Sequence, residues 1–570
     1  MTIDRPGTPR RRVLWYSLTA ALAAFTYFYG LDGQHIPKNG DEYPYEHITR
    51  MTAASGRWLP LQSELKEMRN TKPPLLFWQG VASTNRGKDW ALWNLRWPSV
   101  VYTLLTAALA FLVAMRLSGR VDTGLLALIT FLAFFSTYRY GRPFLTDAPS
   151  VFWLFVPCAA VLASGGRILE SRLSAPILVG IATGVGLLYK SFALLLPVAI
   201  FLAWGYLRRR SYHAVTFLKR DTGKLAIVGV IALAMFSLWF VLDPDPRAIV
   251  NEFVLRENAA KFDAPAGYLG NLVWGRSSLW RLVVSYPLNA GLLLFPVIAL
   301  FVVAFKRRDE WNDGEKLLWM WVLTLFVVFS LPSQRDERYL LPAMPALAVL
   351  CALNWDRISG LAFKSSLAVT GTGLLALGYL SLRLEAEVPG EPLYSPGFWV
   401  LVIGALLFVA ASLFVPGLAR PGVNTAVVLA MLCFAAALRP LDGVRGSYGA
   451  RARELTEGRS VWVPTNFIAK EEGHRFLLPG ADVRGYPLND RLTATELAAR
   501  YPLFAIRLPI NGTAVGGGSV LGERLDIATR QTPDQIRDML RGNVFENLFV
   551  KELLVEAPAT AGTERGGGAH

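Results

Sequence analysis

The sequence predicts an α-helical integral membrane protein that carries a small α/β domain near its C-terminus. Of its 570 residues, 53% are apolar and only 18% are charged. Thirteen apolar runs approach the length of about 20 residues that a helix needs to cross a bilayer. After about residue 440, short alternating strands and helical stretches replace these runs. So many long apolar segments exclude an ordinary soluble enzyme.

The apolar runs are expected to form membrane-spanning helices. They cover about 13–31, 97–115, 121–138, 147–165, 175–189, 192–207, 224–242, 286–305, 317–331, 339–355, 363–382, 397–415 and 424–438. The first run follows Arg10-Arg11-Arg12 and lacks a small-residue cleavage site, so it is expected to be a retained signal anchor. The three cysteines all lie in apolar runs and are expected to be packing residues.

The basic loops predict the orientation of the chain. With the Arg-rich N-terminus in the cytoplasm, alternation through thirteen runs places the strongly basic segment 207–224 on the cytoplasmic side, as the positive-inside rule requires. The odd number of runs then places the C-terminal part outside. These loops account for the net charge of +15. Nucleic acid is not an expected partner, because no basic stretch is interleaved with aromatic residues in a soluble fold.

Residues 1–440 are expected to form the membrane domain, with two long loops outside the membrane. The loop 32–95 contains two amphipathic stretches, Tyr43–Trp58 and Pro73–Val81, which suit helices lying in the membrane interface. The loop 243–285 combines cationic side chains with tryptophans.

Residues 441–558 are expected to form a soluble α/β domain, followed by a Gly-rich, disordered tail over residues 559–570. The predicted elements are strands at Ser460–Val463, Leu503–Arg507 and Phe549–Val555, and helices at Ala494–Ala499 and Asp534–Leu540.

Charged residues gather at the predicted outer ends of the apolar runs, where a membrane protein normally keeps few cations. The set comprises Asp41, Glu42, Lys72, Asp147, Lys190, Arg256, Arg335 and Arg338. Transporters usually place ionisable groups near the bilayer midplane, so this one-sided set favours an enzyme over an anionic-lipid transporter. It predicts a site outside the cytoplasm for an anionic ligand, with a phosphorylated ligand favoured.

Several of these residues also have simpler explanations. Asp147 opens an apolar run, where a carboxylate is stabilised by the helix dipole. Lys72 precedes Pro73-Pro74, which starts a helix whose free N–H groups favour phosphate, but interfacial lysines also snorkel. Lys190 lies between two apolar runs, so its ammonium needs a partner, and a phosphate oxygen or Asp147 would serve. Arg335, Arg338 and Tyr339 suit phosphate binding or headgroup anchoring.

These pieces, in this order, resemble the GT-C glycosyltransferases of the protein O-mannosyltransferase and lipid A aminoarabinose transferase type. The resemblance covers about residues 10–440. It rests on Asp41-Glu42, Lys72-Pro73-Pro74-Leu75, Arg96-Trp97-Pro98, Arg142–Asp147, Lys190 and Ser333–Pro345.

The resemblance implies a GT-C fold in the bacterial inner membrane, with an active site that faces the periplasm. It implies transfer of one sugar, with 4-amino-4-deoxy-L-arabinose favoured, from undecaprenyl phosphate to a lipid A phosphate, with inversion. Another sugar, or a protein or other glycolipid acceptor, remains the alternative. No cofactor is required by the sequence.

The expected site residues fall into three groups. The predicted catalytic residues are Asp41, Glu42 and Asp147. The predicted donor phosphate ligands are Lys72, Lys190, Arg335, Arg338 and Tyr339. The predicted substrate-binding residues are Tyr43, Tyr45, Arg142, Arg256, Asn258 and Lys261.

Two positions depart from the family pattern. Pro44 stands where the family often has an arginine. Glu257-Asn258 stands where the aminoarabinose enzymes typically have Glu-His, so a histidine that would bind a metal is missing. A divalent metal is therefore possible but has no convincing ligand set in the sequence.

Overall fold

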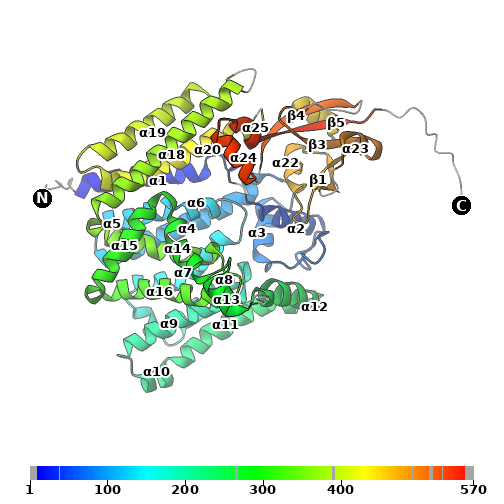
Figure 1. Ribbon diagram of the computed structural model, residues 1–570. Coiled ribbons are helices and arrows are strands. Elements are labelled where there is room, and N and C mark those ends of the chain that lie inside the picture. The colour runs from blue at the N-terminus through cyan, green and yellow to red at the C-terminus, as the bar shows by residue number, and fades with distance from the viewer. Residues whose placement is uncertain are drawn as a thin grey trace. The chain divides into compact units, whose positions relative to one another are not determined.

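The computed structural model describes residues 9–37, 39–262, 267–387, 392–443, 445–488, 492–512, 518–528 and 531–558. The chain is mostly helical and forms two compact units (Figure 1). The helical unit comprises Met1–Leu31, Ile48–Ala376 and Trp399–Ala435. The C-terminal unit comprises Asp32–His47, Leu377–Phe398 and Ala436–His570. The predicted disordered tail, 559–570, lies outside the described residues.

The part of the chain before the sheet is built from helices and short helical turns. They are α1 (Pro9–Phe28), α2 (Glu42–Ala54), α3 (Leu75–Ser83), α4 (Leu92–Ser118), α5 (Val121–Ala133), α6 (Phe135–Tyr140), α7 (Asp147–Ala163), η1 (Arg167–Glu170), α8 (Ser174–Tyr189), η2 (Phe192–Leu194), α9 (Leu195–Arg209), α10 (Ala214–Arg220), α11 (Thr222–Leu242), α12 (Pro246–Ile249), η3 (Val250–Asn258), η4 (Ala259–Phe262), α13 (Tyr268–Val273), α14 (Leu279–Ala290), η5 (Gly291–Leu293), α15 (Leu294–Lys306), η6 (Arg308–Glu310), α16 (Asp313–Ser330), η7 (Glu337–Ala343), α17 (Met344–Leu353), η8 (Trp355–Arg357), α18 (Gly360–Glu387), α19 (Pro396–Phe414) and α20 (Ala419–Asp442).

Seven helical stretches among the described residues are long and apolar enough to cross a membrane, judged by length and composition. They are Leu92–Ser118, Phe192–Arg209, Thr222–Leu242, Leu279–Lys306, Gly360–Ala386, Pro396–Phe414 and Ala419–Asp442. Three shorter apolar helices, α5, α7 and α8, coincide with further predicted runs. The protein is therefore a multi-pass membrane protein, as expected. Its total of thirteen crossings stays a prediction.

The helix boundaries depart from the sequence prediction where local charge hides a helix. α4 begins at Leu92, five residues before the apolar run at 97, because tertiary packing stabilises the helix through Asn94 and Arg96, which interrupt the apolar pattern. Arg96, inside this first part, is only 2% exposed and donates a hydrogen bond to the Leu31 carbonyl at 3.1 Å. The buried guanidinium is thus paired with a backbone acceptor rather than left in apolar surroundings.

The two amphipathic stretches of the first outer loop both form helices, α2 and α3. Pro74 caps α3, which confirms that Pro73-Pro74 precedes a helix start. Lys72 therefore lies directly before this helix, at the place where the sequence predicts a cation.

The C-terminal unit contains a five-stranded sheet, of which Figure 1 labels the arrows β1, β3, β4 and β5. Its strands are β1 (Ser460–Thr465), β2 (Asp482–Pro487), β3 (Leu503–Pro509), β4 (Ser519–Ile527) and β5 (Phe549–Glu556), in the order β2-β1-β3-β5-β4. β1 pairs in parallel with β2 and β3, whereas β5 pairs antiparallel with β3 and β4. The helices of this unit are α21 (Ala450–Thr456), α22 (Glu472–Leu477), α23 (Ala494–Arg500), α24 (Pro533–Leu540) and α25 (Val544–Leu548).

Alternation along the strands supplies an apolar core on each face of this sheet. Val461, Val463 and Leu554 lie in one core, whereas Phe504 and Val555 lie in the other. Successive strand residues point to opposite faces, so β3 and β5 contribute to both cores. The three predicted strands and both predicted helices are confirmed, which establishes the small α/β domain.

Candidate active site

A buried carboxylate in the helical unit holds two of the predicted phosphate ligands. Asp147 is the first residue of α7 and is 1% exposed. Lys190, which caps the C-terminus of α8, donates to Asp147 Oδ1 at 2.7 Å. Arg338 of η7 donates from Nη2 to Asp147 Oδ2 at 2.6 Å. The expectation that Lys190 needs a partner and that Asp147 fixes a basic residue is confirmed.

A second carboxylate gathers two further cations. Glu257, at the end of the π-helix η3, accepts from Lys72 Nζ at 2.5 Å and from Lys261 Nζ at 3.1 Å, both at Oε1. Burial alone would raise the pKa of Glu257, but Lys72 and Lys261 outweigh it and hold that pKa below its usual value. Glu257 is therefore an anion that keeps two ammonium groups together.

The two carboxylate sites form one neighbourhood, which we call the cationic cluster: Lys72, Lys190, Lys261 and Arg338 with Asp147 and Glu257. Burial lowers the pKa of Lys261, Glu257 raises it, and the nearby charges of Lys72 and Lys190 lower it again. The ammonium of Lys261 also lies 5.9 Å from the centre of the Tyr339 ring.

The cations of the cluster are paired around its two carboxylates and are partly exposed. Lys190 and Arg338 share Asp147, and Lys72 and Lys261 share Glu257. The four cationic side chains are between 15% and 26% exposed, whereas Asp147 is almost fully buried. The cationic groups are therefore accessible to a ligand, whereas the Asp147 carboxylate that pairs with two of them is buried. This arrangement attracts an anion such as a phosphate, which forms strong charge-assisted hydrogen bonds with ammonium and guanidinium donors.

Loop-to-loop hydrogen bonds hold the segments that carry the cluster. The backbone N–H groups of Ser333 and Gln334 donate to the Lys261 carbonyl at 2.9 and 3.0 Å. Ser191, next to Lys190, donates to Asn258 Oδ1 at 2.9 Å, which ties the end of α8 to η3. Asn258 thus helps to hold the end of α8, which carries Lys190, against η3. Its contact with substrate stays a prediction.

A small cavity of about 20 Å³ lies beside Asp147. Its lining combines hydroxyl-bearing side chains, including Thr137 and Tyr140, with apolar ones such as Val151 and Met344. The Arg338 guanidinium lies over the Tyr140 ring at 4.9 Å, so Tyr140 links this cavity to the cationic cluster.

Three predicted arginines lie outside the cluster. Arg142 is fully buried and donates to the backbone carbonyls at the end of α1 and to the Tyr138 hydroxyl, the last at 2.6 Å. Arg335 is 2% exposed and donates to the carbonyls of Ser330 and Ser277, each at 2.8 Å. Arg256 forms an exposed ion pair with Glu67. Arg142 and Arg335 therefore connect segments of the helical unit through backbone carbonyls. The predicted contacts of all three arginines with a ligand stay predictions.

The predicted residues at the start of α2 belong to the C-terminal unit. The backbone N–H of Asp41 donates to Asn39 Oδ1 at 3.1 Å, and the carboxylate of Glu42 accepts from the Asn39 N–H at 3.3 Å. Asp41 is half-buried, whereas Glu42 and Tyr45 are 2% and 6% exposed. Tyr43 packs against Gly473, where an added Cβ would lie 3.1 Å from the ring. Their catalytic and substrate-binding roles stay predictions.

Sequence reasoning missed Glu257 and Tyr140 as members of this site. Glu257 was noticed only as the neighbour of a substituted position, although its spacing of four residues from Lys261 on a helical stretch is an ordinary ion-pair signal. Tyr140 gave no comparable signal, because nothing in its local sequence indicates that Arg338 lies over its ring.

Known proteins resemble this chain over most of its length. Residues 38–248 match the family described as dolichyl-phosphate-mannose-protein mannosyltransferase. Undecaprenyl phosphate-alpha-4-amino-4-deoxy-L-arabinose arabinosyl transferase 1 of Sodalis glossinidius is 26% identical over 459 residues, which are 77% of this chain and 73% of the relative. The Pectobacterium atrosepticum arabinosyl transferase is 28% identical over 435 residues, 70% of this chain and 71% of the relative.

Solved structures share the fold. The crystal structure of ArnT from Cupriavidus metallidurans bound to undecaprenyl phosphate has a TM-score of 0.62 at 18% identity, and the match covers 96% of this chain and 99% of that one. The apo structure of the same protein has a TM-score of 0.58. The matched family, the similar relatives and the shared fold together place this chain in the GT-C superfamily of membrane glycosyltransferases, which contains the lipid A aminoarabinose transferases and the protein O-mannosyltransferases.

Proposed function

We propose that this protein transfers a single sugar, 4-amino-4-deoxy-L-arabinose, from undecaprenyl phosphate to a lipid A phosphate at the periplasmic face of the bacterial inner membrane. The observation that carries the proposal is the convergence of four partly exposed cations in the cationic cluster, where Lys190 and Arg338 share one buried carboxylate and Lys72 and Lys261 share another. The names of the similar relatives supply the sugar and its lipid carrier.

The cationic cluster would bind the phosphate of the donor lipid. As the bond between sugar and phosphate breaks, negative charge grows on the departing phosphate, and preformed cationic donors stabilise that charge without reorganising. Asp147 and Glu257 would keep these cations in place before the donor arrives. The cationic side chains would then lose conformational entropy when the protein folds rather than when the donor binds. Undecaprenyl phosphate is then the leaving group, and no nucleotide is needed.

The side chain of Asp41 would act on the acceptor. A lipid A phosphate is already ionised near neutral pH, so Asp41 would position it through an amino or hydroxyl group rather than remove a proton. With a hydroxyl acceptor, the same carboxylate would serve as general base. Attack on the sugar from the side opposite the phosphate gives inversion in either case.

The apolar part of the cavity beside Asp147 supports a lipid-linked donor. Val151 and Met344 offer apolar contacts close to the carboxylate that holds the cluster. A polyprenyl phosphate presents a charged head directly joined to an apolar chain, which fits such a boundary between polar and apolar lining.

A second candidate function is mannosyl transfer to protein, favoured by the family match over residues 38–248. Both reactions use the same leaving group chemistry, so the cationic cluster does not distinguish them. The acceptor and the donor sugar must be identified by assay.

The test is reconstitution of the purified protein in vesicles with defined polyprenyl-phosphate sugars and lipid A. Mass analysis should show lipid A heavier by one aminoarabinose. Transfer of mannose to a peptide instead would replace the first proposal by the second.

The Lys190→Ala variant tests the phosphate site within the same assay. A hydrogen bond to a charged group contributes about 1.5–3 kcal/mol, so transfer should fall by about 10- to 100-fold with a raised KM for the donor. Lys219→Ala, an exposed lysine of α10, is the matched control and should transfer normally. An unchanged donor KM in Lys190→Ala would refute the assignment of the cluster.

A further inference from the structure

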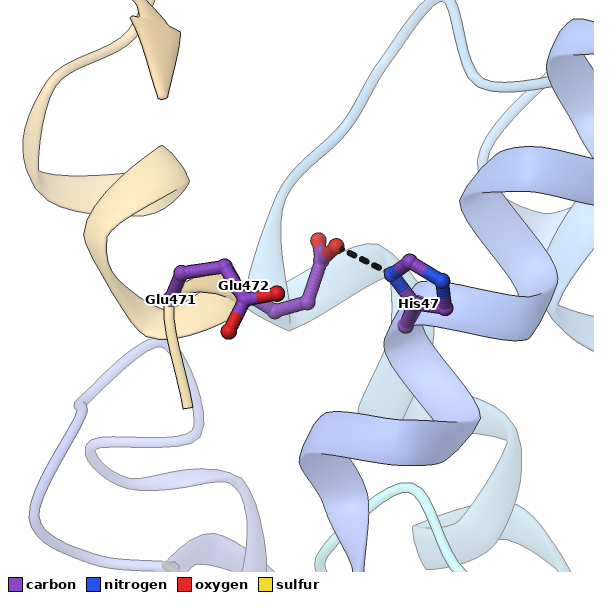
Figure 2. Close-up of side chains that lie close together, drawn as sticks. All are labelled: His47, Glu471 and Glu472. Atoms are coloured by element: carbon purple, nitrogen blue, oxygen red, sulfur yellow. Dashed lines mark hydrogen bonds and ion pairs between the residues drawn. The ribbon is translucent and has the colours of Figure 1, made fainter. Parts of the chain in front are cut away.

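We propose that His47, Glu471 and Glu472 form a binding site for a divalent transition-metal ion, with Zn²⁺ as the best-suited ion. The three residues lie together in the C-terminal unit, and each offers one ligand atom (Figure 2). The site is separate from the cationic cluster and does not depend on which sugar is transferred.

The ligand atoms are close enough for one ion to reach all three. They lie within 4.8 Å of one another, and His47 Nδ1 is 2.9 Å from Glu472 Oε1. Zinc–nitrogen and zinc–oxygen bonds of about 2.0–2.2 Å place two tetrahedral ligands about 3.4 Å apart. Small side-chain rotations therefore convert the present hydrogen-bonded arrangement into a coordinating one.

Two different segments supply the ligands. His47 lies on α2, at the end of the segment Asp32–His47. Glu471 and Glu472 lie at the N-terminus of α22, as Figure 2 shows from the two ribbons that carry the side chains. An ion bound here would join these segments within the C-terminal unit.

Neighbouring groups already orient both carboxylates. Thr465 donates a hydrogen bond to Glu471 Oε2. The guanidinium of Arg475 lies 3.1 Å from Glu472 Oε2. Groups that orient a metal's ligands in this way are a regular feature of metal sites and raise their affinity.

Burial and charge also fit a metal ion. The side chains of His47 and Glu472 are 2% and 0% exposed, whereas Glu471 is half-buried, so the ion would enter from the side of Glu471. The carboxylates of Glu471 and Glu472 bring negative charge to the site, and the guanidinium of Arg475 lies beside one of them. A divalent cation would offset that charge in surroundings that contain little water.

The ligand types select among ions. One imidazole and two carboxylates suit Zn²⁺ and related transition metals, whereas Ca²⁺ and Mg²⁺ prefer oxygen ligands alone. The ordinary alternative is a buried ion pair between His47 and Glu472 that never binds metal. The experiment below distinguishes this ion pair from a metal site.

The consequence of metal binding would be order at the start of α2. Asp41 and Glu42 precede His47 in the same short segment, so a fixed His47 restricts the conformations open to the predicted catalytic carboxylates. The metal would be a positioning element that does not contact the substrate.

The test is a titration of the full-length protein in lipid nanodiscs with Zn²⁺ alone, after metal removal with a chelator. Calorimetry should show one saturable site, and the melting temperature should rise with Zn²⁺ because the ion binds only the folded state. Loading with Co²⁺ alone should give the visible absorption of a coordinated ion.

Glu471→Gln is the decisive variant, because this half-buried side chain is the ligand whose loss least endangers folding. It should weaken Zn²⁺ binding at least about tenfold, and His47→Ala should abolish binding. Glu454→Gln and His213→Ala, both exposed, are the matched controls and should bind as the parent does. Absence of a saturable site, or an unchanged affinity in Glu471→Gln, would overturn the proposal in favour of a metal-free ion pair.

Discussion

The two units of this protein each contain a group of paired charges, and the two groups differ in exposure. In the cationic cluster of the helical unit, the four cationic side chains are between 15% and 26% exposed. In the C-terminal unit, a network is centred on the fully buried carboxylate of Glu552. Glu552 accepts from Arg524 Nε at 2.8 Å, from Arg507 Nε at 3.1 Å and from the Tyr448 hydroxyl at 2.5 Å.

Further charged groups extend the C-terminal network. Asp526 pairs with Arg507, and the two ring nitrogens of His35 lie 3.1 and 2.8 Å from Asp526 and Asp442. The side chains of His35, Asp442 and Asp526 are at most 6% exposed.

The pKa directions agree with this contrast. Burial alone would raise the pKa of Glu552, but Arg524 and His474 hold it well below its usual value. Burial lowers the pKa of His474 more than the neighbouring Glu552 carboxylate raises it. The comparison teaches that a network whose members are mostly buried stabilises the fold, whereas a group of partly exposed cations is accessible to a ligand.

The largest expected effect is on stability, from Glu552→Gln. Breaking a buried pair removes the carboxylate that Arg524 and Arg507 share and should lower the free energy of unfolding of the C-terminal unit by about 3–5 kcal/mol. Denaturant unfolding measures this change, and Glu523→Gln, an exposed neighbour on β4, is the control. Transfer per folded molecule should be unchanged. A large loss of transfer without loss of stability would mean that this network is functional after all.

The next effect is on transfer, from Arg338→Lys. The change keeps the charge but loses the planar guanidinium that lies over Tyr140 and reaches Asp147. Transfer should fall by about tenfold, with unfolding little affected, in the vesicle assay. Arg281→Lys, which alters an exposed pair with Asp336, should transfer like the parent. Equal activity of Arg338→Lys and the parent would show that charge alone matters.

A smaller effect, on pH dependence, is expected from Glu257→Gln. The Glu257 carboxylate raises the pKa of Lys261, so its removal lowers that pKa further. Lys261 then loses its proton at lower pH, and the alkaline limb of the kcat/KM profile should move to lower pH. Below this limb, the donor KM should fall a few-fold, because one competing anion is gone. An alkaline limb that does not move would exclude Lys261 from donor binding, and Glu67→Gln serves as control.

The smallest effect is expected from Arg256→Ala. Arg256 forms an ion pair with Glu67 in which both side chains are about half exposed, and such surface pairs contribute at most about 1 kcal/mol. Transfer should change by less than about twofold. A loss comparable to that of Lys190→Ala would instead support the sequence-based expectation that Arg256 contacts substrate.

The sequence anticipated much of the fold and part of the site. Apolar runs located the helices, and alternation located β1, β3 and β5, because both signals are local. β4 was missed because Gly522 lies at a bulge and because two of its charged residues, Arg524 and Asp526, are buried by ion pairs. The partnership of Lys190 with Asp147 was anticipated, since an ammonium beside apolar runs requires an anion.

The sequence by itself determined that this chain has long membrane helices, a small mixed sheet and an excess of cations near certain helix ends. Only the tertiary structure decided which charges meet. The partners of Asp147 are distant in sequence, with Lys190 43 residues away and Arg338 191 residues away. Lys72, which pairs with Glu257, is 185 residues away from it. Helix formation depends on neighbours within a few residues, whereas a buried ion pair depends on how distant segments pack, and no local pattern records that packing.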